Sequence, residues 1–404
     1  MRYAAWELHT DGRHRPVEIE AHGEVASGWR VSRSSGGELA LPPGYAPVDV
    51  LRCGVCSTDL ARTHLPFALP QVGGHELLAR TREGRRVVVE INASCAARGA
   101  APCATCAAGL DRHCPHRLVL GIDRLDGGFA PHALVPVGAC VDVPDAITDD
   151  AAGFAEPLAA ALRALEVARP RVGDRVAVVG PRKLGLLIIA ALRAVGGVHV
   201  TALPRRAALA DRCRAFGADD VVVLDEDEDA GTSAPRFDLV FDTSGSPAGL
   251  ATAIALARRE VHLKSTHGRD ACGLRHTTAL VVDELALVRE DRADAARSEA
   301  AIDDRIVPPD GVRRVSPCGS IAIARDAQAT GPLVRAIRDR GLRLTSSRCG
   351  DLRAAIAALA AAPALQALLA QQITHRFAGD QLDLAFAAAA SPDAIKVIVE
   401  PRAS

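Results

Sequence analysis

The chain has 404 residues, of which 49% are hydrophobic and 24% charged, an ordinary globular composition that excludes a fibrous or disordered protein. Its formal net charge is -1 and only 3% of residues are aromatic, so neither nucleic acid nor an anionic membrane is expected as a partner. The longest apolar run near the middle, 184–192, is far shorter than the roughly 20 residues of a membrane span. The first residues, MRYAAWELHTDGRH, contain no apolar signal core, which predicts a cytoplasmic protein.

The first 150 residues differ in texture from the rest of the chain. They are rich in Gly, Pro, His and Cys, and they contain short β-like runs such as 86–91 and 132–137. This pattern predicts an irregular, strand-based domain built around loops.

From Ala151 onward, apolar residues at helical spacing alternate with short β-branched runs, which is typical of βαβ units around a parallel sheet. The predicted strands are 175–179, 198–203, 220–224, 237–242, 260–264 and 394–399, and the predicted helices are 183–195, 205–216, 247–258 and 351–361. The second half is therefore predicted to be a doubly wound α/β sheet.

Two stretches carry no assigned chemistry. The acidic run 225–229 is predicted to be a solvated loop. The stretch 272–340 combines a charged helical piece at 289–305, a Pro/Gly segment at 307–311 and a strand-like run at 320–324. It is predicted to be an insertion within or beside the sheet domain.

Eleven cysteines, an odd number in a large chain, argue against a disulfide framework. Four of them follow the spacing C-x7-C-x2-C-x7-C, and closely paired thiolates of this kind hold structural zinc: Cys95, Cys103, Cys106 and Cys114. The alternative is a small core of four unmetallated cysteines. The single cysteines later in the chain are predicted to be buried packing residues.

A second group of candidate metal ligands combines cysteine, histidine and glutamate residues. Cys53 and Cys56 form a CxxC pair, His75 and Glu76 follow two glycines, and Glu156 comes much later. Each piece alone has a plain alternative, since CxxC can be redox-active or structural and a histidine after two glycines is often a turn residue. Together they supply the thiolate, imidazole and carboxylates that a catalytic zinc takes, with one position left for water or substrate.

A turn after the first strand of the second half resembles a dinucleotide-binding fingerprint. Gly180 and Gly185 stand at i and i+5, after a strand and at the opening of a helix, but Arg182 replaces the middle glycine. The residues expected to contact a dinucleotide here and at the following strand ends are Gly180, Arg182, Lys183, Leu184, Gly185, Arg205, Arg206 and Lys264. No acid follows the second strand, so the paired arginines favour NADP over NAD, with exposed helix-start residues as the alternative.

The motifs resemble, in their order, those of the zinc-dependent medium-chain alcohol dehydrogenases, particularly the polyol, glucose and threonine dehydrogenase branch. The similarity rests on CSTD at 56–59, GHE at 74–76, the cysteine lobe, GGFA at 127–130, EPLA at 156–159 and the strand-turn-helix at 175–190. It implies a zinc-binding, β-rich GroES-like catalytic domain at 1–155 and a Rossmann-type domain at 156–365, with the insertion at about 272–340. Residues 366–404 would return to the catalytic domain.

The resemblance also implies roles for single residues. Cys56, rather than Cys53, would be the catalytic zinc thiolate and His75 the imidazole ligand, while Glu76 and Glu156 would bind or exchange at the metal. Thr58 matches the hydroxyl that passes on the substrate proton, and Asp59 the acid that orients the histidine ligand.

Three departures from the family pattern stand out. The loop between Cys95 and Cys103 is longer than in the family, which costs little closure entropy. Ala61 stands where some members carry a relay histidine, for which His64 is a substitute candidate, and Arg182 alters the glycine turn.

The resulting expectation is a zinc enzyme that interconverts a secondary, polar or polyol-like alcohol and its ketone with NAD(P). Catalytic and structural zinc are the expected metals, and the family's habit implies a homodimer or homotetramer. Two alternatives remain open. One is a zinc lyase or isomerase on the same scaffold that has lost hydride transfer, and the other is a non-catalytic, zinc-stabilised binding protein.

Overall fold

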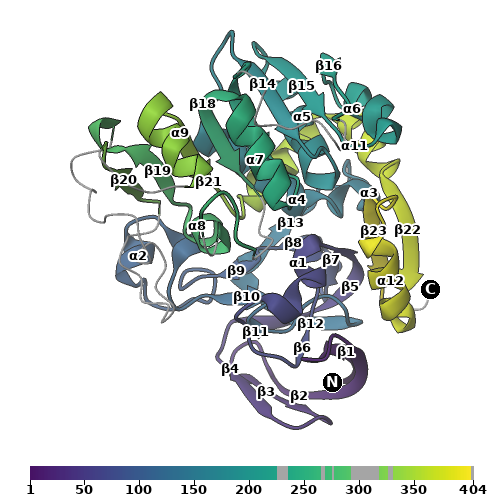
Figure 1. Cartoon of the computed structure of the whole chain (residues 1–404). Coiled ribbons are helices and arrows are strands. Elements are labelled where there is room, and N and C mark those ends of the chain that lie inside the picture. Colours follow the sequence, from purple (N-terminus) through teal and green to yellow (C-terminus); the bar gives the residue numbers. More distant parts are fainter. Residues whose placement is uncertain (225–234, 265–268, 275–276, 293–317, 326–330, 402–404) are drawn as a thin grey trace. The chain divides into compact units, whose positions relative to one another are not determined.

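The computed structural model describes residues 1–224, 235–264, 269–274, 277–292, 318–325 and 331–401 (Figure 1). The chain forms two compact units, one made of Met1–Ala159 with Asp351–Ser404 and the other of Ala160–Gly350. The first unit is therefore built from two separate stretches of chain.

The first unit is rich in strands, which form three sheets. One has the order β4-β3-β2-β1-β6, with β1 Arg2–Leu8, β2 His14–Glu24, β3 Gly28–Arg33, β4 Glu38–Leu41 and β6 Gln71–Val72. A small sheet contains β9 Asn92–Ala93, β10 Leu118–Leu120 and β11 Arg124–Leu125. The largest has the order β13-β8-β7-β5-β23-β22, with β12 also paired to β5: β5 Tyr45–Val55, β7 Glu76–Thr81, β8 Arg86–Val89, β12 His132–Pro136, β13 Cys140–Asp142, β22 Ile373–Ala378 and β23 Lys396–Glu400.

The helices of this unit are mostly short. They are α1 Ser57–Leu60, α2 Ala104–Ala107, α3 Asp149–Ala152, α10 Leu352–Ala361, α11 Pro363–Ala370 and α12 Leu382–Ala390, while α4 Ala155–Ala168 crosses into the second unit in sequence. The C-terminal strand β23 pairs antiparallel with the end of β5, so the last strand of the chain lies beside residues 53–55 (Figure 1). This pairing places C-terminal side chains next to those that follow β5.

The second unit is a single sheet with the order β16-β15-β14-β17-β18-β21-β19-β20, and the predicted doubly wound α/β sheet is confirmed. Its strands are β14 Arg175–Val179, β15 His199–Leu203, β16 Asp220–Val221, β17 Phe237–Asp242, β18 Ala257–Leu263, β19 Ala286–Arg289, β20 Ser320–Ile323 and β21 Arg343–Ser346. The described helices are α5 Lys183–Val195, α6 Ala210–Ala215, α7 Pro247–Leu256, α8 Thr277–Asp283 and α9 Pro332–Arg340.

The central strands of this sheet are parallel, and their apolar runs are buried on both faces. The strand order reverses at β14, since β15 lies on one side of it and β17 on the other. In open α/β sheets, ligands bind at the carboxyl ends of the strands beside such a switch point.

Several predicted elements have different bounds in the structure. The charged helix expected from Arg289 is wrong in its described part, because Arg289 ends strand β19 and Glu290–Arg292 forms a single 3-10 turn. Residues 286–288 are buried in succession and pair with β20 and β21, and this strand pairing outweighs the helical charge spacing. Within 272–340, β19 and β20 join the main sheet. The predicted solvated loop at 225–229 and the Pro/Gly segment at 307–311 lie outside the described residues.

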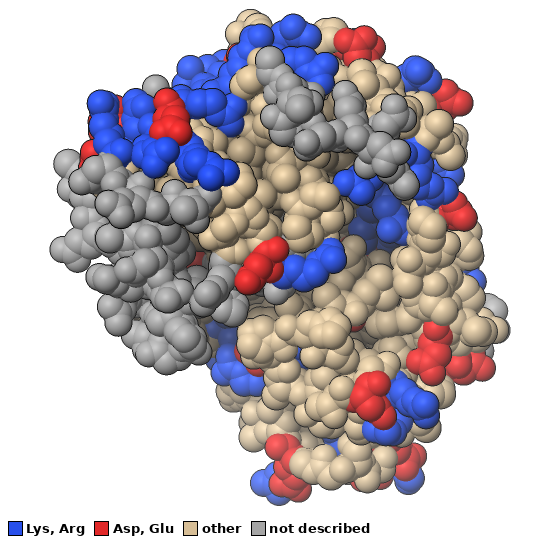
Figure 2. Space-filling model, viewed as in Figure 1, with Lys and Arg blue, Asp and Glu red and all other residues tan. Residues whose placement is uncertain are grey.

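No single helix in the described part of the chain is long and apolar enough to cross a membrane, and only the bent pair α10 and α11 meets those requirements jointly, with a 103° angle between them. Basic and acidic side chains occur next to one another on the surface shown in Figure 2, in keeping with the formal net charge of -1.

Candidate metal centre and dinucleotide turn

Strand pairing in the first unit brings three predicted ligands together. Cys56 follows β5, and Glu76 begins β7, which pairs antiparallel with β5 so that Gly54 lies opposite Glu76. The ligand atoms of Cys56, His75 and Glu76 all lie within 4.8 Å of one another. A thiolate, an imidazole and a carboxylate at this spacing are a donor set that suits zinc.

The carboxylate of Asp59 contacts two of these three ligand residues, Cys56 and His75. Its Oδ2 accepts a hydrogen bond from the backbone N of Cys56 at 2.8 Å, and its Oδ1 lies 3.4 Å from Nδ1 of His75. Burial alone lowers the pKa of His75, but the carboxylate of Asp59 outweighs it and raises that pKa well above its usual value. Because Nδ1 faces Asp59, Nε2 of His75 is the atom left to bind a metal.

Gly74 is needed for this arrangement. Its φ of +94° lies in the left-handed region, and a Cβ there would come within 2.8 Å of the thiol of Cys53 and 3.0 Å of the backbone N of Phe129. The tight turn before His75 therefore depends on glycine.

Glu76 has a second partner that the sequence patterns did not reveal. Lys396, at the start of β23, donates a hydrogen bond to Oε2 of Glu76, and both side chains are fully buried. Its Nζ also lies 4.8 Å from the ring centroid of Phe154. The only sequence signal is a lysine inside the apolar strand that ends the chain, and the space for this ion pair exists because position 54 is glycine.

Of the two remaining predicted catalytic residues, Thr58 lies beside the ligand group and Glu156 is not part of it. The thiol of Cys56 donates to Oγ1 of Thr58 at 3.8 Å, so Thr58 lies beside the ligand group. Glu156, in the first turn of α4, is half-buried and is not one of the residues whose ligand atoms cluster within 4.8 Å. Cys53 is fully buried in β5, and burial raises the pKa of its thiol.

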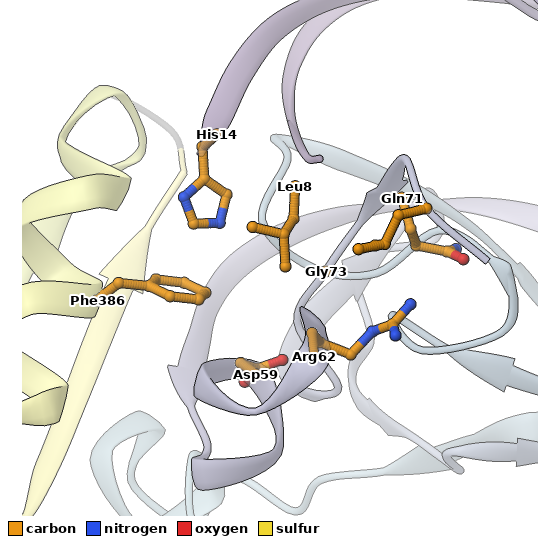
Figure 3. Close-up of a pocket in the computed structure, with 8 residues that line it drawn as sticks. Leu8, His14, Asp59, Arg62, Gln71, Gly73 and Phe386 are labelled. Carbon is orange, nitrogen blue, oxygen red and sulfur yellow. The ribbon is translucent and has the colours of Figure 1, made fainter. Parts of the chain in front are cut away.

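Asp59 is one of the residues that line a small cavity (Figure 3). Its lining residues include His14, Arg62, Gln71 and Phe386, and its volume of about 10 Å³ is close to what one water molecule needs. His14 contributes a ring nitrogen that lies 2.7 Å from Oδ1 of the exposed Asp383. Asp59 thus shares this cavity with polar side chains and an aromatic ring.

The four lobe cysteines also converge. The sulfur atoms of Cys95, Cys103, Cys106 and Cys114 lie within 4.8 Å of one another, with Cys95 and Cys114 3.5 Å apart. All four are free thiols. The backbone N–H of Cys106 lowers the pKa of Cys103 to about 7, which favours a thiolate there. This cluster could hold a tetrahedral metal ion such as structural zinc.

The glycine turn of the second unit is closely packed. Gly180 has a φ of +69°, and a Cβ there would meet the Cα of Ser244 at 2.6 Å. The hydroxyl of Thr243 donates to the carbonyls of Val179 and Gly180 at 2.9 and 3.0 Å. A Cβ at Gly185 would meet the same hydroxyl oxygen at 2.6 Å, so both glycines are required by packing.

Arg182 is the N-cap of α5, with φ −100° and ψ −150°, a conformation that does not require glycine. It is half-buried, as are Lys183 and Leu184. Beyond β15, Arg205 is exposed and Arg206 half-buried. The carboxyl ends of β14 and β15 therefore carry basic side chains, and no carboxylate lies between Leu203 and Arg206.

Comparison with known proteins supports the expected family. Residues 42–145 match the family model of the alcohol dehydrogenase GroES-like domain. L-idonate 5-dehydrogenase of Escherichia coli K12 is 26% identical over 234 residues, which cover 52% of this chain and 66% of that protein. The chain thus spans less than two thirds of this relative's length.

Two solved structures show the same fold over nearly the whole chain. A zinc-binding dehydrogenase of Sinorhizobium meliloti 1021 bound to NADP has a TM-score of 0.64 at 20% identity, covering 99% of this chain and 100% of that one. An alcohol dehydrogenase of Escherichia coli CFT073 in complex with NADH has a TM-score of 0.67 at 18% identity, covering 99% of each chain. The chain is thus similar to alcohol dehydrogenases in a GroES-like domain of its first unit, and it shares the overall fold of these two dehydrogenases.

Proposed function

We propose that this protein is an NAD(P)-linked dehydrogenase that interconverts a secondary alcohol, polar or polyol-like, and the corresponding ketone. The observation that carries the proposal is the convergence of Cys56, His75 and Glu76 within 4.8 Å, with Asp59 against the histidine. L-Idonate 5-dehydrogenase is one of the similar proteins, and its name supports the substrate class.

Cys56, His75 and Glu76 would hold the catalytic zinc, with Glu156 as a carboxylate that exchanges onto it. When bound, the metal supplies Lewis acidity, which lowers the pKa of a substrate hydroxyl. Asp59 fixes the ring of His75 and the backbone of Cys56 before substrate arrives. The Thr58 hydroxyl, next to the Cys56 sulfur, accepts the substrate proton and passes it to solvent.

The second unit would hold the dinucleotide that accepts the hydride. The turn Gly180–Gly185 and the N-terminus of α5 favour a pyrophosphate, because the helix dipole places partial positive charge at a helix start. Arg205 and Arg206 follow β15 where a carboxylate would select NAD, so we expect NADP to bind more tightly. Each of the eight proposed coenzyme contacts, including Leu184 and Lys264, belongs to this unit. A homodimer or homotetramer is the expected assembly.

A zinc enzyme without hydride transfer is the second candidate, and Arg182 at the middle glycine position is the observation that favours it. Fluorescence titration with NADPH and NADH separates the two. The dehydrogenase should bind NADPH with a micromolar Kd and NADH at least about tenfold more weakly. If neither coenzyme binds at millimolar concentration, the dehydrogenase proposal fails and the second candidate is favoured.

A further inference from the structure

Five buried polar side chains form a continuous row across two strands of the second unit. Glu260, His262 and Lys264 alternate along β18 and its end, and Thr345 and Ser347 occupy the facing positions along β21 and its end. Because side chains two apart in a strand share a face, all five lie on the same side of the sheet. None is more than 7% exposed.

Hydrogen bonds connect these side chains without a gap. Nζ of Lys264 donates to Oγ of Ser347 at 3.0 Å, and Oγ of Ser347 lies 2.9 Å from Nε2 of His262. Nδ1 of His262 lies 2.9 Å from Oγ1 of Thr345. Oγ1 of Thr345 donates to Oε1 of Glu260 at 2.6 Å.

The acceptor at one end of the row, Glu260, and the donor at the other end, Lys264, set the direction of all its hydrogen bonds. Thr345 gives its single proton to Glu260, so it must accept from Nδ1–H of His262. Nε2 of the neutral ring is then an acceptor, and it takes the proton of Ser347, which in turn accepts from Lys264. Burial, followed by the positive charge of Lys264, lowers the pKa of His262 well below its usual value, in keeping with a neutral ring.

The ammonium group at the end of this row also binds backbone. Nζ of Lys264 donates to the carbonyl of Ser347 at 3.0 Å and to the carbonyl of Arg348. With Oγ of Ser347, these acceptors match the three hydrogens of an ammonium group. Lys264 therefore ties the end of β18 to the chain segment 347–348 that leaves β21.

This segment lies at a functional edge of the sheet. Strands β14, β17, β18 and β21 are parallel, so their carboxyl ends, including the glycine turn and positions 264 and 347, lie along one edge. Nucleotides bind along this edge in doubly wound sheets.

We propose that the row Glu260–Thr345–His262–Ser347–Lys264 is a positioning device for coenzyme binding, which sets the backbone of 347–348 through the ammonium of Lys264. The inference rests on the proposed function. Lys264 then acts through the neighbouring backbone, as a positioning residue rather than the direct coenzyme contact proposed for it above. His262 is held as the Nδ1–H tautomer, which keeps the hydroxyl hydrogen of Ser347 directed away from the ammonium of Lys264.

Thr345→Val tests the row at the link between Glu260 and His262, away from the coenzyme edge. Valine has the same shape but cannot connect His262 to Glu260, whereas Thr345→Ser keeps the connection. Thr201→Val, at a buried threonine of β15 outside the row, is the matched control. The measurements are the Kd for NADPH by fluorescence and the tautomer of His262 by ¹⁵N NMR of histidine-labelled protein, assigned with His262→Gln.

We expect Thr345→Val to raise the Kd at least fivefold and to abolish the Nδ1–H signature of His262. Thr345→Ser and Thr201→Val should stay within twofold of the wild type. An unchanged Kd in Thr345→Val, or an equal rise in Thr201→Val, would overturn the inference while leaving the proposed function intact. A wild type that binds neither coenzyme would overturn both.

Discussion

Cys53 and Cys56 are only three residues apart but lie in different environments, and the difference in environment makes only Cys56 a suitable metal ligand. Cys56 lies beyond the end of β5 with its sulfur near His75 and Glu76, whereas Cys53 is inside the strand and fully buried. The thiol of Cys53 contacts the carbonyl of Gly54 at 3.8 Å and fills the space beside Gly74 and Gly128. Metal binding needs a thiolate, and burial disfavours one at Cys53.

We therefore expect opposite effects from two single substitutions. Cys56→Ser should lower kcat/KM at least about a hundredfold and remove one zinc per chain, with a melting temperature within about 2 °C of the wild type. Cys53→Ala should keep the metal content and lose stability by about 1–2 kcal/mol, because it leaves a small cavity. Metal analysis, steady-state kinetics and thermal melting measure these effects; a large melting loss in Cys56→Ser would make that cysteine structural.

Glu90 is a half-buried acid outside the candidate metal centre. It follows β8, and its Oε1 accepts a hydrogen bond from the backbone N of Leu352 at the start of α10 at 3.0 Å. Burial raises the pKa of this carboxyl group to about 7, although the hydrogen bond from Leu352 opposes the rise. The folded state thus binds a proton more tightly than the unfolded chain, where the usual value is 4.5.

This raised pKa predicts a pH-dependent stability. The free energy of unfolding should fall by about 2 kcal/mol as pH rises from about 4.5 to about 7, because ionised Glu90 is disfavoured in the folded protein. Glu90→Gln should remove this part of the pH dependence, whereas Glu24→Gln, at an exposed residue ending β2, should not. Urea unfolding at pH 5 and pH 8 compares the variants, and an identical pH slope in Glu90→Gln would contradict the prediction.

At the scale of elements, β23 shows how the last strand of the chain completes the candidate site. It pairs with β5 through Val397 opposite Val55 and brings Lys396 to Glu76, 320 positions away in sequence. An ion pair without solvent contact is costly to break, because the partner left behind keeps its charge without compensation. The strand thereby couples the C-terminal residues to the ligand group.

In metal-free protein, Lys396→Met should destabilise the first unit by about 3–5 kcal/mol, since it leaves the buried carboxylate of Glu76 without the ammonium of Lys396. Adding Glu76→Gln in the same chain should recover part of that loss. Arg376→Met, on neighbouring β22 with a 40% exposed side chain, removes a surface ion pair with Asp150 and should cost less than about 1 kcal/mol. Denaturant unfolding gives these differences, and equal losses at both positions would refute the argument.

At the scale of the whole molecule, both candidate metal centres belong to the first unit. They differ in the regular structure around them. The Cys56 group lies next to the paired strands β5 and β7, whereas the regular structure of the lobe at 95–114 is limited to the short helix α2 and one 3-10 turn. Metal at the first is thus expected to matter for activity, and metal at the second for folding.

The purified protein should contain two zinc ions per chain. Mild chelation should remove one of them, with loss of turnover and little change in melting temperature. Cys103→Ser should lower the melting temperature by at least about 10 °C, because binding at a structural site adds directly to folding free energy. A protein with one zinc, or a Cys103→Ser variant that melts like the wild type, would contradict this assignment.

Much of the fold follows from local patterns. β-Branched runs separated by helical periodicity predict the strands and helices of the second unit, because burial on both faces of a parallel sheet demands continuous apolar residues. The glycines at 180 and 185 and the spacing of the four cysteines could also be interpreted directly, since backbone conformation and chelation depend on short-range spacing. The helix expected at Arg289 was wrong because a strand partner overrides local charge spacing.

Other features, the contacts between buried polar side chains, depend on strand pairing and cannot be predicted from local sequence patterns. Lys396 meets Glu76, and Thr345 and Ser347 meet His262, only because β23 pairs with β5 and β21 with β18. The sequence alone determined which segments become strands and which residues have metal-binding chemistry. The tertiary structure decided which buried polar groups become partners, because that depends on long-range strand pairing rather than on neighbours in the chain.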